Sequence, residues 1–154
     1  MQLAFEYAKK AFDKNEVPVG CVILHFPTNT IIAQTHNKVE EQKDCTWHAE
    51  IEAIKIASAL LNSKNLSECD MYITLEPCTM CISAISNSRI RRLYYAVADP
   101  KQGAVESGVK FLDSPSCYHY PEVYSNIMEN ESRELLVRFF QKLRLADKKS
   151  DFYS

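Results

Sequence analysis

The sequence predicts an α/β fold, a three-layer α/β/α sandwich around a mixed five-stranded sheet. Helical and strand-like patterns alternate along the chain after an opening pair of apolar runs that are joined by a turn. The 154 residues suit one domain with a sizeable core. Hydrophobic residues make up 46% and charged residues 25%, which is typical of globular proteins. We expect a single domain over residues 1–147 and a frayed tail over residues 148–154.

The first half of the chain predicts a helix, a β-hairpin and a second helix. Gln2–Asn15 carries apolar residues at helical spacing. Gly20–Phe26 and Thr30–Thr35 are short apolar runs on either side of a Pro-Thr-Asn turn, which favours a hairpin. Ala49–Leu61 returns to helical spacing, with apolar residues along most of its length.

The second half alternates strand and helix and ends in a helix. The expected elements are a buried strand Met71–Leu75, a helix from Pro77 to about Ser86, a strand Arg92–Val97, a short edge strand near Tyr120–Tyr124, and a helix Glu131–Leu145. Between residues 98 and 125, Pro, Gly and Ser are frequent, which predicts loops.

Charge and hydropathy limit the location and the partners. The formal net charge is −2, so a nucleic-acid partner would have to bind a local basic patch. Basic residues gather in two places: Arg89, Arg91 and Arg92, and on the last helix Arg138, Lys142, Arg144, Lys148 and Lys149. The N-terminal segment is amphipathic, and no apolar run reaches the ~18 residues of a membrane span. We expect a cytoplasmic protein that binds neither membrane nor DNA.

The six cysteines suit a reducing compartment, where thiols stay free. Cys21 lies in an apolar run, which predicts a buried and inert thiol. Cys45, Cys69 and Cys117 fall in predicted loops, and we expect no function for them.

Two short motifs carry the chemistry. Cys78 and Cys81 stand three apart at a predicted helix start, so their sulfurs point the same way and the helix dipole favours their thiolates. With the imidazole of His48 they make three ligands of a tetrahedral zinc site, which leaves one position for water. Zinc can lower the pKa of such a water to about 7. Glu50, two residues after His48, is spaced to carry protons. Together these groups suit hydrolytic removal of an amino group from an aromatic ring.

Other interpretations weaken when the motifs are taken together. A lone Cys-x-x-Cys is often a redox pair or half of a zinc ribbon, but the second Cys-x-x-Cys of a ribbon is missing. A thioredoxin-like pair would follow the first strand, whereas this pair follows the third. His-x-Glu followed by Pro-Cys-x-x-Cys is the signature of zinc nucleobase deaminases.

The sequence resembles the bacterial tRNA adenosine deaminases, within the cytidine deaminase-like fold. The resemblance runs through "EVPVG" (16–20), "HAEI" (48–51), "TLEPCTMC" (74–81), "SRI" (88–90), "DPKQGA" (99–104) and the late "FF". It implies deamination of adenosine to inosine at the wobble position, position 34, of the tRNA anticodon loop. A free-base or nucleoside deaminase of guanine or cytosine type is the alternative. A zinc-stabilised RNA-binding partner without activity is a third reading, which the presence of Glu50 disfavours.

The resemblance also implies roles for individual residues. One Zn²⁺ per subunit would be held by His48, Cys78 and Cys81, with Glu50 moving protons. The residues implied in substrate binding are Asn37 at the target base, Asp99 and Lys101 at the anticodon-loop backbone or ribose, Phe139 and Phe140 near flanking nucleotides, and Arg144 at a phosphate. Each of these roles has an alternative. Asn37 could be a turn residue after the second strand, and one of the two phenylalanines could belong to the hydrophobic core. Arg144 could be a solvent-exposed side chain without an RNA contact. The implied partners are a tRNA anticodon stem-loop and a second copy of the chain in a homodimer.

Three features depart from the family pattern. Trp47 precedes the metal histidine where a small residue is common, and Cys45 stands where proline is frequent. The chain reads Val105-Glu106-Ser107 where a glycine-serine step is usual. We expect these changes to affect loops beside the pocket rather than the metal ligands.

Overall fold

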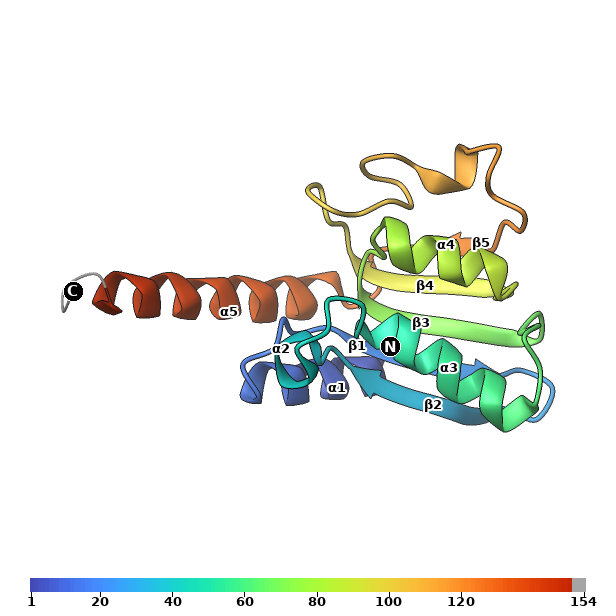
Figure 1. The fold of residues 1–154 in the computed structure, drawn as a ribbon, viewed down its shortest axis with the longest axis horizontal. Helices are drawn as coiled ribbons and strands as arrows, with labels where there is room; N and C mark the ends of the chain where they lie inside the picture. The colour runs from blue at the N-terminus through green and yellow to red at the C-terminus, as the bar shows by residue number, and fades with distance from the viewer. Residues whose placement is uncertain (151–154) are drawn as a thin grey trace.

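The computed structural model describes residues 1–150 and confirms the predicted α/β fold. A five-stranded sheet lies between two layers of helices (Figure 1). The elements are α1 (Gln2–Asp13), β1 (Gly20–His25), β2 (Thr30–His36), α2 (Val39–Gln42), α3 (Ala49–Leu61), β3 (Cys69–Leu75), α4 (Thr79–Asn87), β4 (Arg92–Val97), a 3₁₀ turn η1 (Phe111–Asp113), β5 (Glu122–Tyr124) and α5 (Glu129–Ser150).

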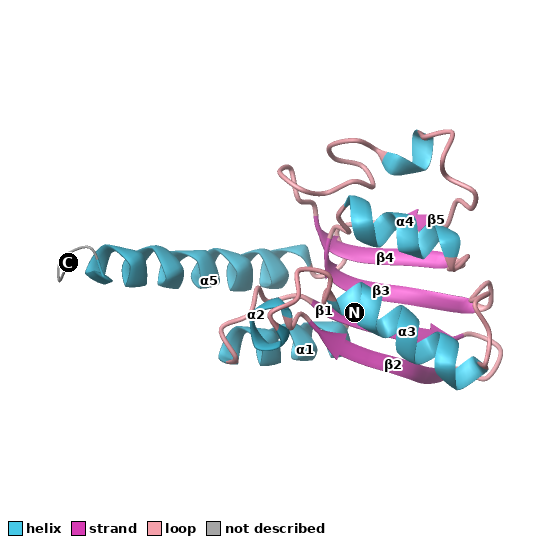
Figure 2. Ribbon diagram, viewed as in Figure 1, coloured by secondary structure: helices cyan, strands magenta, loops and turns pink. Residues whose placement is uncertain are grey.

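The sheet is mixed, as the sequence predicts. Its strand order is β2-β1-β3-β4-β5. β1 runs antiparallel to both β2 and β3, whereas β3, β4 and β5 are parallel to one another. α3 and α4 lie side by side over one face, and α1 and α5 pack on the other (Figure 2). Because β3 and β4 are parallel and α4 connects them, the start of α4 lies at the carboxyl end of β3, beside the start of α3 (Figure 1).

Close packing fixes α1 against β1. Ala4, Ala8 and Ala11 are buried on the side of α1 that meets the sheet. A Cβ on Gly20 would stand 2.0 Å from the carbonyl oxygen of Ala4 and 2.5 Å from the backbone nitrogen of Ala8. Glycine at position 20 is therefore what lets the helix backbone lie directly on the strand.

The structure corrects several sequence-based boundaries. Cys69, predicted in a loop, is a buried first residue of β3. Asp70, the next residue, is polar and interrupts the apolar pattern of the strand. It can be buried there because its carboxylate accepts two hydrogen bonds from Arg91, at 2.8 and 2.7 Å. α2 is a short helix that the sequence does not predict. Pro77 lies before α4 rather than in its first turn, since Cys78 is the N-cap.

The C-terminal boundary also differs from the prediction. α5 begins at Glu129 and continues to Ser150, so residues 148–150, predicted as part of a frayed tail, extend the helix. The rest of that predicted tail, residues 151–154, lies outside the described residues. The edge strand expected near Tyr120–Tyr124 is present as β5. In the described part of the chain, no helix is both long enough and apolar enough to cross a membrane.

Candidate metal centre and active site

Three potential metal ligands meet where α3 and α4 begin. His48 is the N-cap of α3, Cys78 is the N-cap of α4, and Cys81 lies in the first turn of α4. Nδ1 of His48 lies 3.8 Å from the sulfur of Cys78 and 3.4 Å from that of Cys81. A tetrahedral zinc with Zn–S near 2.3 Å and Zn–N near 2.0–2.1 Å requires nitrogen–sulfur separations of about 3.6 Å. The three groups therefore fit a zinc ion, and with three ligands they leave a fourth position open.

The three ligand groups shift one another's pKa values. The hydrogen bond from Cys81 lowers the pKa of Cys78 to about 4, and His48 adds to the effect. The pKa of Cys81 is raised, first by its hydrogen bond to Cys78 and then by burial. The hydrogen bond with Cys78 also raises the pKa of His48. Because cysteine binds zinc as a thiolate, metal binding has to displace the proton that the raised pKa favours on Cys81.

Glu50 is a buried carboxyl group beside this centre. It lies in the first turn of α3 and is 4% exposed. Burial raises the pKa of Glu50 from 4.5 to about 7, because the surroundings disfavour the charged form. A carboxyl group with a pKa near neutrality can both accept and donate a proton at physiological pH, as a proton carrier must.

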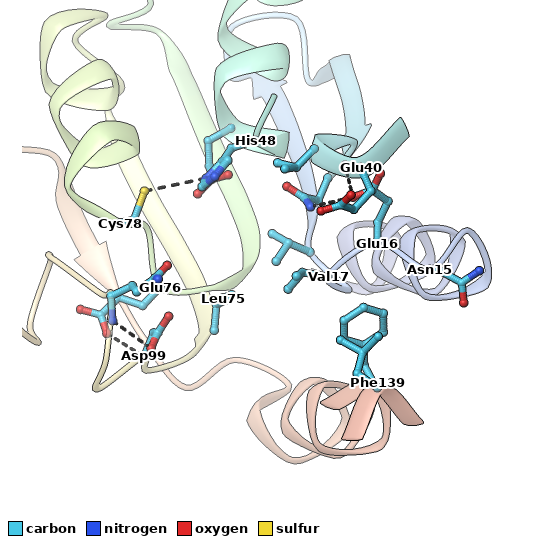
Figure 3. A pocket seen from close by; sticks show the side chains of 16 residues that line it. Asn15, Glu16, Val17, Glu40, His48, Leu75, Glu76, Cys78, Asp99 and Phe139 are labelled. Carbon is cyan, nitrogen blue, oxygen red and sulfur yellow. Dashed lines mark hydrogen bonds between the residues drawn. The ribbon is translucent and has the colours of Figure 1, made fainter. Parts of the chain in front are cut away.

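A cavity of about 380 Å³ opens in front of His48, Glu50 and Cys78 (Figure 3). Val17 and Leu75 form part of its apolar lining. The polar residues Glu16, Asn37, Glu76 and Asp99 also line it. The cavity thus combines apolar surface, suited to an aromatic ring, with a few polar groups that can fix its orientation.

Asn37, predicted to contact the base, lines this cavity and is held by a residue that the sequence analysis missed. Its Nδ2 donates to the carboxylate of Glu16 over 3.2 Å, and both side chains are buried. Glu16 also accepts hydrogen bonds from the backbone of Glu40 and Glu41, at 3.1 and 2.6 Å, and so caps the N-terminus of α2 (Figure 3).

Glu76 is a second buried carboxylate that the sequence analysis did not assign. It accepts hydrogen bonds from four backbone N–H groups and one hydroxyl of the loop that follows β4, and the donors belong to Asp99, Val105, Glu106 and Ser107. Although burial alone would raise the pKa of Glu76, the donors of Ser107 and Asp99 hold it below its usual range. This carboxylate therefore fixes the 99–107 loop next to Cys78.

Gly103 makes the close packing of that loop possible. A Cβ at this position would stand 2.4 Å from Oε2 of Glu76 and 2.5 Å from the carbonyl oxygen of Asp99. Val105-Glu106-Ser107 departs from the family pattern, yet the backbone N–H groups of these three residues all donate to the Glu76 carboxylate and hold the loop there. The departure also adds a contact, since the buried Tyr95 of β4 donates its hydroxyl to the carboxylate of Glu106.

The other predicted RNA-binding residues divide into two groups. Asp99 borders the cavity, where its Oδ1 accepts a hydrogen bond from the backbone of Lys101 at 2.9 Å. Phe139 borders the cavity as well, but it is 2% exposed and packs edge-on against Phe12. Lys101, Phe140 and Arg144 instead line an adjoining groove of about 700 Å³ between α5 and the 98–102 segment.

Trp47 and Cys45, which depart from the family pattern just before His48, are not among the three potential metal ligands. Trp47 is half-buried, and its indole N–H has no hydrogen-bond partner within the described residues. The ammonium group of Lys55 lies 5.5 Å from the centre of its ring. Cys45 is exposed and free. Cys21 is fully buried, as predicted, and burial raises the pKa of its thiol.

The chain is similar to zinc-binding deaminases in both sequence and structure. Residues 1–97 match the family described as the cytidine and deoxycytidylate deaminase zinc-binding region. The chain is 52% identical to the tRNA-specific adenosine deaminase of Rickettsia typhi over 144 residues, covering 94% of this chain and 97% of that one. It is 49% identical to the tRNA-specific adenosine deaminase of Agrobacterium fabrum over 147 residues, covering 96% and 95%. A structure solved in work on A-to-I editing by tRNA:A34 deaminases at the wobble position of transfer RNA aligns with a TM-score of 0.85 at 49% identity, covering 88% of this chain and 97% of that one.

Proposed function

The chain belongs to the tRNA-specific adenosine deaminases, within the zinc-binding cytidine and deoxycytidylate deaminase family, and we propose on this basis that it converts adenosine to inosine at position 34 of the tRNA anticodon loop. The observation that carries the proposal is the meeting of a three-ligand zinc centre and a buried carboxyl group at the floor of one cavity. The overall reaction consumes water and releases ammonia.

We assign the proton transfers to Glu50. Zinc held by His48, Cys78 and Cys81 supplies the Lewis acidity that lets water attack at neutral pH. Glu50 takes the proton of the attacking water and delivers it to N1 of the adenine ring. It then takes the second proton from the hydroxyl group now on C6 and passes it to the departing amino group, so that the C6–N bond breaks, a C6 carbonyl forms and ammonia leaves. In the metal-free chain, burial raises the pKa of Glu50 to about 7, so the site disfavours a permanently charged carboxylate.

The substrate is a base in a flexible single strand rather than in a duplex. The cavity is a recess at the end of the sheet, and a base in a duplex would have to leave its stack to enter it. An unpaired adenine in a loop can enter with little unstacking cost. Asn37 then contacts the base, and Asp99 faces the same space. The adjoining groove, with Phe140, Lys101 and Arg144, offers an aromatic surface and two cations to flanking nucleotides. An anticodon loop meets these requirements.

Two further assignments rest on the resemblance. We propose that the chain acts as a homodimer with one zinc ion per subunit. The alternative, a free-base or nucleoside deaminase, has less support, because curated relatives at 36–52% identity over at least 94% of the chain are tRNA-specific.

The test compares RNA with small molecules. Zinc-loaded protein is incubated with an anticodon stem-loop carrying adenosine at position 34, and separately with adenosine, guanine and cytidine. Inosine in the stem-loop alone is the expected result. Deamination of a free base or nucleoside with an untouched stem-loop would remove the RNA assignment and keep the zinc chemistry. The Glu50→Ala variant should keep its zinc and lose all deamination, and retained activity would mean that another group carries the protons.

A further inference from the structure

We infer that Glu16 is a positioning residue that fixes the orientation of the Asn37 amide, and so decides which of its polar atoms face the base. The inference rests on the proposed function for the contact between Asn37 and the base. Glu16 itself is 1% exposed and has no place in the proton transfers described above.

Each group that the structure places against the Glu16 carboxylate is an N–H donor. Oε2 accepts from Nδ2 of Asn37 and from the backbone of Glu40, and Oε1 accepts from the backbone of Glu41. If the Asn37 amide were turned over, its carbonyl oxygen would face Oε2 at the same separation, and two acceptors would repel each other. The carboxylate therefore permits only one of the two amide orientations.

The backbones that carry this pair are anchored independently of the amide contact. The N–H of Glu16 bonds to the carbonyl oxygen of Ala11 at 2.9 Å, which closes the end of α1 after Asn15 adopts a left-handed conformation. The N–H of Asn37 bonds to the carbonyl oxygen of Val19 at 3.0 Å. With both backbones fixed, the remaining freedom of Asn37 lies in its side-chain torsions, and the hydrogen bond to Glu16 restrains them.

The consequence is a defined recognition pattern in the cavity. One Nδ2 hydrogen of Asn37 is used by Glu16, which leaves the carbonyl oxygen and the second N–H for a ligand. One acceptor beside one donor is the pattern that pairs with the N6 amino group and N7 of adenine. A carbonyl at C6, as in the inosine product, would instead face the Asn37 oxygen. The arrangement thus favours the substrate base over the product base.

Glu16→Gln tests the inference because Gln is nearly isosteric but can also donate a hydrogen bond, which allows the Asn37 amide to turn over. On the position-34 adenosine stem-loop, this variant should lose about tenfold in kcat/KM, as expected for one misplaced hydrogen bond, mainly through kcat. In an Asn37→Ala background, the same change should alter kcat/KM by less than about twofold. Glu134→Gln, an exposed substitution on α5, is the matched control and should leave kcat/KM unchanged.

The two backgrounds distinguish positioning from a structural role. An equal loss with and without Asn37 would show that Glu16 acts by capping α2, and the inference would be wrong. Full activity of Asn37→Ala alone would also overturn it, since the amide would then contribute nothing to recognition. Relative binding of adenosine and inosine stem-loops gives a second measure. Glu16→Gln should narrow the preference for adenosine, and an unchanged preference contradicts the inference.

A readout without substrate separates this inference from the proposed function. In ¹⁵N-labelled, zinc-loaded protein, one side-chain amide proton of Asn37 should resonate downfield because it bonds to a carboxylate. Glu16→Gln should move that resonance upfield, and Glu134→Gln should not. If the wild-type protein fails to deaminate any stem-loop, the proposed function falls, while this spectrum still decides whether Glu16 orients Asn37. An Asn37 resonance that ignores Glu16→Gln overturns the inference.

Discussion

Replacing Glu50 by Gln should stabilise the zinc-free protein above neutral pH. Burial raises the pKa of Glu50 from 4.5 to about 7. Between these two pH values the folded chain keeps a proton that the unfolded chain has released, so stability falls as pH rises through the window. A difference of about 2.5 pKa units (7 − 4.5) at ~1.4 kcal/mol per unit corresponds to roughly 3 kcal/mol at pH 8. Gln is neutral at every pH and avoids this cost.

Urea unfolding of chelator-treated protein measures the effect. The stability advantage of Glu50→Gln over wild type should be about 1 kcal/mol at pH 5, where the window has just been entered, and about 3 kcal/mol at pH 8. Glu134→Gln, an exposed change on α5, is the matched control for the loss of one carboxyl group. An advantage that is the same at pH 5 and pH 8 would show that Glu50 is charged in the folded chain at both values, and the account of its proton transfer would lose its physical basis.

Three other predictions concern the metal centre and its support. Cys78→Ala should reduce bound zinc to a small fraction of one ion per chain, whereas Cys21→Ala, which removes a fully buried thiol outside the group of three ligands, should leave zinc content intact, as elemental analysis would show. Gly20→Ala should lower the free energy of unfolding by about 1–3 kcal/mol, because the new Cβ overlaps the backbone of α1, and a urea midpoint equal to wild type would contradict the close packing. Glu76→Gln should speed hydrogen exchange in the 99–107 loop and raise the KM for the stem-loop, since an amide cannot accept all five hydrogen bonds of the carboxylate.

The local pattern of the chain was enough to predict the sheet, the helices that flank the site and the group of His48, Cys78 and Cys81 that could hold a metal ion. The spacing of Cys78 and Cys81 depends on one helical turn, and that turn follows the apolar strand β3 directly. His48 could be predicted as the third ligand because His-x-Glu stands at the start of the long helical pattern that precedes β3 in the chain. Such features are readable because neighbouring residues determine them. The same reasoning failed at Cys69, because the polar Asp70 interrupts the apolar pattern of the strand that Cys69 begins.

Only the tertiary structure decided what Glu16 and Glu76 do. Their partners lie 21–25 and 23–31 residues away in sequence, and most of those partners are backbone N–H groups, which every residue except proline possesses. A carboxylate that binds backbone leaves no complementary side chain to find in the sequence. The raised pKa of Glu50 is of the same kind, because it depends on the burial of the side chain in the folded protein. The sequence by itself thus predicted which groups carry the proposed chemistry, whereas the packing of distant segments determined how those groups are oriented and how deeply they are buried.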